Sequence, residues 1–348
     1  MPRICGRGCT AMAQPDYLIV GAGLAGSVCA RQLAEAGRSV LVVEQRAHVA
    51  GNAYDYYDDT GVLVHKYGAH IFHTNSMAVV DYLSQFTAWR PYEHRVMSSV
   101  NGALLPIPMN RTTLAHFRGD IAAARRVLVE PYTRKQWGPY ADQLDPTVVA
   151  RITPRWTDED RYFTDTYQQM PASGYTAMVN RMLAHPQITV RLRTSYWDMP
   201  VARAPTIYSG PIDEYFGYRL GLLPYRSARF AFVSHRVPQV QPVGVINHPS
   251  ETAAYTRVVE FKHLTGQSHP WTTVAYEYPT AAGDPYWPVP TSASAALYSQ
   301  YKALADATPG VHFVGRLGRY AYLDMHQVVA QALTLTRRLL TGQTQEVA

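Results

Sequence analysis

The feature that most constrains the fold is a glycine motif near the start of the chain, Gly21-x-Gly23-x-x-Gly26. It follows the short apolar run Tyr17–Val20, which is typical of a buried strand, and it precedes Ser27–Ala36, whose apolar residues recur with helical spacing. In such a motif the first glycine forms a tight turn, the second lets the backbone approach a pyrophosphate, and the third lets the helix pack on the strand. The pattern predicts a dinucleotide whose phosphates lie at the N-terminus of this helix.

A second apolar run, Ser39–Val43, completes a strand–helix–strand unit and ends at Glu44. Glu44 lies 23 residues after Gly21, where a carboxylate would hold the ribose hydroxyls of the dinucleotide. Leu24 and Ala25 open the helix, and we expect them to contact the cofactor as well. The unit predicts an α/β protein with a Rossmann-like domain.

The residues after this acid favour FAD over NAD. Gln45 and Arg46 follow it directly, and a second glycine-bearing loop comes next, at Gly51 and Asn52. This arrangement is typical of FAD-binding proteins in which Glu-x-x-x-x-x-Gly-Gly continues the cofactor site, although Ala50 stands here at the first glycine. We predict that Gln45, Arg46, Gly51 and Asn52 contact FAD.

The remaining pattern predicts a larger protein built around this unit. The chain has 348 residues, with 47% hydrophobic and 17% charged residues, which fits a globular protein of one large domain with insertions or of two to three lobes. We expect a Rossmann-like FAD-binding domain, a β-sheet substrate lobe and a reduced helical lobe. The predicted segments are the first part of the FAD-binding core (14–100), a reduced helical and substrate lobe (101–170), a return to the core (171–215), a β-rich substrate lobe (216–300) and a C-terminal FAD-binding segment (301–342).

Further elements follow from apolar periodicity and turn signals. The predicted strands are Val62–Val64, Val96–Val100, Ile188–Leu192, Pro205–Tyr208 and Val311–Val314, with several more between 228 and 279. The predicted helices are Met77–Phe86, His116–Val129, Tyr175–Ala184 and Asp324–Leu340.

Charge and cysteine content limit the class of partner. The net charge is +6, but the basic residues are dispersed, which fits an anionic small molecule better than a nucleic acid. No apolar run approaches the roughly 18 residues that span a bilayer, so no membrane partner is expected. Cys5, Cys9 and Cys29 form neither a disulfide framework nor a metal-type spacing, which predicts a cytoplasmic protein. We expect residues 1–13 to be a frayed leader, with Met12 as a candidate start.

At this point the sequence resembles the UDP-galactopyranose mutase family along most of its length. The matching stretches are GAGLAGS (21–27), EQR (44–46), GNAYD (51–55), HKYGAHIFHT (65–74), LPIPMN (105–110), YTRKQWG (132–138), DRYFTDTYQ (160–168), SGPIDEYF (209–216), YTRVVEF (255–261) and GRLGRYAYLDM (315–325). The resemblance implies an isomerase that uses reduced FAD to interconvert the pyranose and furanose forms of a nucleotide-activated hexose. It also implies that flavin N5 acts as the nucleophile at the anomeric carbon.

The resemblance places four residues on the diphosphate of that substrate. Arg151 and Arg257 match two arginines of the family that hold it, and a guanidinium would stabilise the charge of a leaving diphosphate. Tyr162 and Tyr322 match tyrosines that donate hydrogen bonds to it, and Tyr322 also belongs to the cofactor segment.

Other substrate contacts are implied in the same way. Tyr132 and Trp137 match an aromatic pair beside the nucleotide base, where stacking contributes roughly 1–3 kcal/mol. Asn247 is a further candidate near the sugar, and Tyr286 and Trp287 match the position of two tyrosines of the family.

Two segments are implied to lie against the flavin. His70 and His73 match a loop beside it, which also holds Ile71 as a cofactor contact. A histidine there would stabilise the reduced flavin, so His70 would be catalytic as well. Arg316 matches a cation near the pyrophosphate, Asp324 an acid on the ribityl chain, and Met325 a helix start that faces the isoalloxazine. The spacing of His70 with neighbouring histidines is also compatible with a metal, but no carboxylate lies close in sequence, and we predict none.

The chain departs from the family in two places. Tyr132 follows Asn110 by only 22 positions, where the family has much of a helical domain. We therefore expect room for one sizeable helix and an altered dimer interface. The sequence does not predict the oligomeric state. Trp287 replaces a usual tyrosine, and Ala69 a usual proline. The substrate could therefore be UDP-galactose or another nucleotide hexose such as a GDP-hexose, for example GDP-galactose.

Two alternatives of other classes stay open. A flavin-dependent oxidoreductase of the amine-oxidase type would share the fold, and a non-catalytic flavin or nucleotide-sugar binder would share the ligands.

Overall fold

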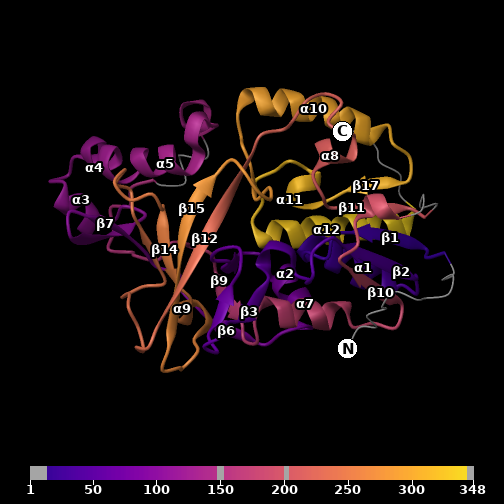
Figure 1. Ribbon diagram of the computed structural model, residues 1–348, viewed down its shortest axis with the longest axis horizontal. Helices are drawn as coiled ribbons and strands as arrows, with labels where there is room; N and C mark the ends of the chain where they lie inside the picture. Colours follow the sequence, from indigo (N-terminus) through magenta and orange to yellow (C-terminus); the bar gives the residue numbers. More distant parts are fainter. Residues whose placement is uncertain (1–13, 147–152, 200–203, 343–348) are drawn as a thin grey trace.

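A five-stranded parallel sheet forms the larger body of the protein (Figure 1). The computed structural model describes residues 14–146, 153–199 and 204–342. The strand order is β10-β2-β1-β11-β17, and every neighbouring pair is parallel. These strands are β1 (Tyr17–Val20), β2 (Val40–Glu44), β10 (Ile188–Leu192), β11 (Thr206–Tyr208) and β17 (Val311–Phe313). All five were predicted from the sequence to within one residue at each end.

Helices cover both faces of this sheet, which explains why β2 is buried along its whole length. Alternate strand residues point to opposite sides: Ile19 and Val42 belong to one core cluster, whereas Leu18 and Leu41 belong to another. The helices packed on the first side are α1 (Leu24–Glu35), α7 (Tyr175–Leu183) and α12 (Met325–Thr341). A third cluster joins the sheet to α8 (Ile212–Tyr215) and α10 (Ser292–Asp306).

The second body is a seven-stranded, mostly antiparallel sheet with the order β16-β12-β15-β14-β13-β7-β8. Its strands are β7 (Val96–Val100), β8 (Ala103–Ile107), β12 (Tyr225–His235), β13 (Val245–Asn247), β14 (Arg257–Glu260), β15 (Thr272–Thr280) and β16 (Trp287–Pro288). Strand β7 thus joins this sheet, although it lies within the residues that we attributed to the first part of the FAD-binding core. Helices α3 (Arg111–His116), α4 (Ile121–Leu128) and α5 (Glu130–Trp137) lie beside it (Figure 1).

Short elements connect the two bodies. Strands β5 (Phe72–Thr74), β9 (Tyr167–Pro171) and β6 (Trp89–Pro91) form a three-stranded sheet, and β3 (Asp55–Tyr57) pairs with β4 (Leu63–His65). The remaining elements are α2 (Met77–Ser84), α9 (Phe261–Thr265), α11 (Gly315–Gly318) and the 3₁₀ turns η1 (Gly51–Ala53), η2 (Gly138–Gln143) and η3 (Tyr196–Asp198).

The predicted single helix His116–Val129 is wrong. The chain ends α3 at His116 and starts α4 only at Ile121, so the interval between Asn110 and Tyr132 holds two short helices and the first turn of α5. Gly119 has φ +81°, a left-handed conformation that interrupts a helix. Asp120 then caps α4, because its side chain accepts from the backbone N–H of Ala123 at 2.9 Å.

Gly26 sets the distance between α1 and β1. A Cβ at this position would lie 2.0 Å from the carbonyl oxygen of Gly21 and 3.0 Å from Ile19. A Cβ at Gly23 would meet nothing closer than the Cα of Gly51, at 3.7 Å, and Gly23 has an ordinary extended backbone.

We therefore expect Gly26→Ala to lower the free energy of unfolding of the ligand-free protein by about 1–3 kcal/mol, because the helix must move off the strand. Gly23→Ala should change it by less than about 0.5 kcal/mol. Urea denaturation of both variants measures this contrast, and equal effects of the two substitutions would contradict it.

Candidate active site

A cavity of about 600 Å³ lies over the carboxyl ends of β1, β2 and β11, where ligands bind in open α/β sheets. Gly21, Gly23, Leu24 and Ala25 line it and bring the first turn of α1 to its wall. Gly26 is absent from the wall, since it serves the packing of helix on strand. The unpaired N–H groups of this helix start can bind a phosphate.

Glu44 is buried at the end of β2 with 6% of its surface exposed. Its Oε2 accepts from the backbone N–H of Ala22 at 2.9 Å, and its Oε1 accepts from that of Arg46 at 2.9 Å. These two bonds fix the carboxylate between the glycine turn and the next loop. Each oxygen keeps a second lone pair, so the group can still accept from a ribose hydroxyl.

The loop after Glu44 continues the same wall, which also includes Gln45, Gly51 and Asn52. The Arg46 guanidinium donates to Asn52 Oδ1 at 2.8 Å and pairs with Asp284 at 2.9 Å. It also lies over the ring of Tyr67, 4.6 Å from the ring centre. Arg46 therefore ties the Rossmann-like part of the chain to the loop that follows β15.

Ala50 occupies the left-handed region with φ +71° and is 1% exposed. The backbone at this point needs the conformation that glycine adopts without strain, and an alanine there costs roughly 1 kcal/mol. Ala50 thus takes a backbone conformation that glycine would adopt more readily.

A second cavity, of about 240 Å³, lies between the parallel sheet and the seven-stranded sheet. Its wall shares five residues with the first cavity, so the two spaces meet at Asn52, His70, Tyr286, Arg316 and Met325. A ligand in the first cavity can therefore reach a ligand in the second. Among the residues that line the second cavity alone, Val96, Ile107, Leu128 and Val129 are apolar.

Arg257 is the cation of the second cavity that the seven-stranded sheet supplies. Its Nε donates to Glu277 Oε2 at 2.7 Å across the pairing of β14 with β15, where the two residues are directly opposite. Glu277 has no exposed surface, whereas 26% of the Arg257 side chain is exposed, toward the cavity that it lines. Burial alone would lower the pKa of Arg257, but the Glu277 carboxylate reverses the shift and raises it. Arg257 thus stays charged, with part of its guanidinium available to an anion.

Arg316 lies at the junction of the two cavities, where backbone carbonyl groups hold its guanidinium group. Its Nε and Nη2 donate to the carbonyl oxygen of Leu323 at 3.2 and 2.6 Å, and its Nη1 donates to that of Tyr286 at 3.4 Å. Its guanidinium carbon also lies 5.5 Å from the ring centre of Tyr322. Asp324 caps the N-terminus of α12 just beyond, and its backbone N–H donates to the side chain of Gln327 at 2.8 Å.

His70 is a neutral histidine in the wall between the cavities. Burial, with a smaller effect of nearby His65, lowers the pKa of His70 to about 3. Its Nδ1 lies 2.9 Å from the carbonyl oxygen of Gly68, and because a carbonyl only accepts, Nδ1 carries the ring proton. The other ring nitrogen of His70 is therefore a hydrogen-bond acceptor at neutral pH.

Tyrosines supply the hydroxyl groups of the second cavity. Tyr132, Tyr162, Tyr286 and Tyr322 all line it. Burial raises the pKa of Tyr132, and burial together with Asp284 raises the pKa of Tyr286 to about 12. These two phenols thus stay protonated at neutral pH, so they can donate to an anionic ligand.

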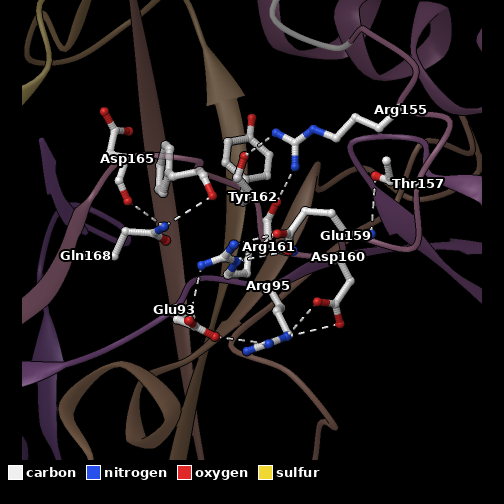
Figure 2. Close-up of polar contacts among 11 residues, drawn as sticks. Glu93, Arg95, Arg155, Thr157, Glu159, Asp160, Arg161, Tyr162, Asp165 and Gln168 are labelled. Atoms are coloured by element: carbon white, nitrogen blue, oxygen red, sulfur yellow. Dashed lines mark hydrogen bonds and ion pairs between the residues drawn. The ribbon is translucent and has the colours of Figure 1, made fainter. Parts of the chain in front are cut away.

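Tyr162 is positioned by the segment that carries it (Figure 2). Arg155 donates to the carbonyl oxygens of Arg161 and Tyr162 at 2.6 and 3.1 Å, and the Tyr162 N–H donates to the carbonyl oxygen of His94 at 2.6 Å. The ion pairs around it, Arg161–Glu159, Arg161–Glu93, Arg95–Glu93 and Arg95–Asp160, all reach solvent, with each side chain 29–49% exposed, and such pairs contribute little each. The bonds to backbone carbonyls therefore hold the tyrosine in place.

Comparison with known proteins agrees with this geometry. A family model described as UDP-galactopyranose mutase matches residues 127–322, and one described as an NAD(P)-binding Rossmann-like domain matches residues 19–86. A probable UDP-galactopyranose mutase of Klebsiella pneumoniae is 34% identical over an alignment of 372 positions, gaps included, which covers 95% of this chain and 96% of that protein. The chain belongs to the UDP-galactopyranose mutase family.

Two further likenesses bear on fold and substrate. The crystal structure of a reduced UDP-galactopyranose mutase matches with a TM-score of 0.75 over 96% of both chains at 13% identity, which shows the fold. A dTDP-fucopyranose mutase of Escherichia coli is 28% identical over an alignment of 361 positions, gaps included, which covers 91% of this chain and 96% of that protein. Family membership favours the isomerase prediction over the amine-oxidase alternative.

FAD is the cofactor of this family, and the described residues fit it. The glycine turn leaves space for a pyrophosphate, and Glu44 is fixed where a ribose would lie. Trp197 and Leu222 line the far part of the same cavity, yet they are 52% and 72% exposed. A bound dinucleotide would cover such large apolar side chains.

Some predicted site residues lie elsewhere. Arg151 is outside the described residues. Trp137 is 7% exposed, lines neither cavity and packs beside Tyr322, with ring centres 6.3 Å apart. Asn247, Trp287 and the remaining predicted contacts of the flavin-side segments, Ile71, Asp324 and Met325, do line the second cavity.

Sequence reasoning missed several wall residues. Tyr67, His94 and Phe163 line the second cavity, and Glu277 holds Arg257. Glu277 could have been noticed, because it is the one charged residue of its strand, TTVAYEYPT. Tyr67 and Phe163 are neighbours of predicted motif residues, but no periodic pattern marks them.

Within the described residues, no group of three or more histidine, cysteine, aspartate or glutamate side chains is arranged to hold a metal ion. None of the helices in this part of the chain is long and apolar enough to cross a membrane.

Two buried histidines predict how stability depends on pH. Burial lowers the pKa of His65 to about 4 and that of His94 to about 3, and both side chains are at most 4% exposed. The unfolded chain binds protons on these rings below about pH 6.5, whereas the folded chain does not. The free energy of unfolding should therefore fall as the pH decreases from about 6.5 toward 4, and neither ring contributes a slope above that range.

His94→Gln should reduce that slope by up to about 1.4 kcal/mol per pH unit, while the amide oxygen still accepts from Tyr92, which bonds His94 at 3.0 Å. Urea denaturation from pH 4.5 to 8 measures the slope, and an unchanged slope in the variant would show that His94 titrates normally.

Proposed function

We propose that this protein uses reduced FAD to interconvert the pyranose and furanose forms of a nucleotide-diphosphate hexose. The observation that carries the proposal is the junction of the two cavities at His70, Arg316 and Met325, with Arg257 and the tyrosines on the side away from the glycine turn. A cofactor over the glycine turn would present its reactive ring at this junction. The sugar would lie there, and the diphosphate would lie between Arg257 and the tyrosine hydroxyls.

The FAD, when bound and reduced, supplies the nucleophile, flavin N5, for the anomeric carbon of the sugar. The residues of the chain bind and orient around that step. Arg257 would hold the diphosphate as it gains charge, and Arg151 would be its second cation. Tyr162 and Tyr322 would donate to the phosphate oxygens, and the neutral ring of His70 would offer an acceptor on the flavin side.

The identity of the nucleotide is the finer part of the proposal. UDP-galactose and a GDP-hexose are the candidates that the sequence raised, and the Escherichia coli relative named a dTDP-fucopyranose mutase adds a third kind of base. Val96, Ile107, Leu128 and Val129 are apolar residues that line the second cavity but not the first, and in this proposal they would contact the base. Such a wall offers contact area but few hydrogen bonds to base edges.

The direct test is an HPLC assay of dithionite-reduced, FAD-loaded protein against UDP-, GDP- and dTDP-hexopyranoses. We expect one of these substrates to give a furanose product without net oxidation, and the oxidised protein to give none. A fully loaded, reduced protein that leaves the whole panel unchanged would exclude the mutase. FAD and nucleotide binding without turnover would identify a non-catalytic binder.

A second prediction concerns Arg257, whose removal alone would leave Glu277 buried without its cation. Arg257→Met should therefore destabilise the protein by about 3–5 kcal/mol in addition to any effect on activity. The double variant Arg257→Met, Glu277→Gln removes both charges and should fold with FAD bound. Its kcat should fall by about 10²–10³, because a donor to the leaving diphosphate is lost.

Glu277→Gln is the matched control, since it keeps Arg257 and removes the same carboxylate. We expect its kcat to stay well above that of the double variant, with equal FAD absorbance in both. Equal turnover in the two variants would remove Arg257 from the proposed site.

A further inference from the structure

Lys135 lies in a cage of backbone carbonyl groups. It belongs to α5, and its ammonium donates to the carbonyl oxygens of Ser250, Ala253 and Tyr255 at 2.9, 3.0 and 2.9 Å, with a further short contact to that of His248. All four acceptors belong to one loop. An ammonium has three N–H donors, so four carbonyls around it form a site for a compact cation.

The loop and the helix both carry residues of the second cavity. The loop connects β13, which ends at Asn247, with β14, which begins at Arg257. On α5, Tyr132 precedes Lys135 by three positions, so the two side chains lie on one face of the helix. Asn247, Arg257 and Tyr132 all line the cavity.

A second cation, which is buried, holds the end of the same helix. Arg226 of β12 is 5% exposed and donates to the carbonyl oxygen of Gln136 at 2.9 Å. Lys135 thus binds α5 to the β13–β14 loop, and Arg226 binds it to β12, which lies elsewhere in the sequence. Both cations satisfy backbone carbonyls, and neither lines either cavity.

We propose that Lys135 is a positioning residue, which docks α5 on the β13–β14 loop and so holds Tyr132 opposite Arg257 for the nucleotide diphosphate. The inference rests on the proposed function for its ligand and on the carbonyl cage for its mechanism. Without the ammonium, four carbonyls face one another, the helix undocks, and a ligand must restore the docked state when it binds. The apparent Kd then rises by the inverse of the docked fraction, whereas the saturated complex is docked again.

The neighbouring residue offers a matched control. Arg134 also reaches this loop, through an ion pair with Glu251 at 3.1 Å, but both side chains are more than half exposed. Such a pair contributes little. Arg134→Met therefore removes a positive charge from the same helix and an ion pair with the same loop, while the ammonium of Lys135 stays among its carbonyl groups.

The experiment compares Lys135→Met, Lys135→Arg and Arg134→Met as FAD-loaded proteins. Hydrogen exchange of peptides that cover 130–137 and 248–255 reports docking, and calorimetry with UDP, GDP and dTDP reports binding. We expect Lys135→Met to exchange at least tenfold faster in both peptides and to raise the Kd of the preferred nucleotide at least tenfold. FAD content should be unchanged, and kcat at saturating sugar nucleotide should change less than threefold.

Lys135→Arg should also lose exchange protection and nucleotide affinity, since a planar guanidinium does not fit a cage for a compact cation. Arg134→Met should match the wild type. In Lys135→Ala, propylammonium should restore protection and affinity in a saturable manner, and propanol should not.

Wild-type exchange in Lys135→Met, or faster exchange with an unchanged Kd, would overturn the proposal. So would a loss of affinity that propylammonium does not restore, because that is the behaviour of general misfolding. If the wild type binds none of the three nucleotides, the proposed function fails, and the exchange and rescue measurements alone decide whether the ammonium docks α5.

Discussion

The second cavity depends on a carboxylate that is buried inside the seven-stranded sheet. Glu277 has no exposed surface, and such a charge is stable only with a partner. Arg257, directly opposite on the neighbouring strand, supplies it. Because the pair is anchored by strand register, the guanidinium keeps its place at the cavity with or without a ligand, and little reorganisation is needed when a diphosphate arrives.

Five basic residues near the second cavity fall into two groups by whether they line it. Lys135, Arg155 and Arg226 are used on backbone carbonyl groups and shape the segments that carry tyrosines. Arg257 and Arg316 line the cavity and can meet an anion. A net charge of +6 therefore gives no measure of how many cations a substrate would meet, and the composition of the chain could not separate the two groups.

The sequence predicted what local patterns encode. The strand–glycine turn–helix–strand unit and the parallel strands follow from short-range periodicity. The family resemblance pointed to Tyr132, Tyr162, Arg257 and Arg316, and all four line one cavity. The contacts that it missed are non-local. The partner of Arg257 is 20 residues away on another strand. Trp137 was expected beside the base, but it is buried next to Tyr322, which only the docking of α5 determines. The broken helix at Gly119 was a local signal that apolar periodicity outweighed.

The shared wall of the two cavities constrains how substrate preference can change. His70, Arg316 and Tyr286 face both spaces, so a substitution there would alter cofactor and substrate contacts together. The residues that line the second cavity alone do not have this double effect. This part of the wall includes Leu128 and Val129, where α4 meets α5. If a relative of this fold changes its nucleotide while it keeps its chemistry, this is the part of the wall that can change without disturbing the flavin.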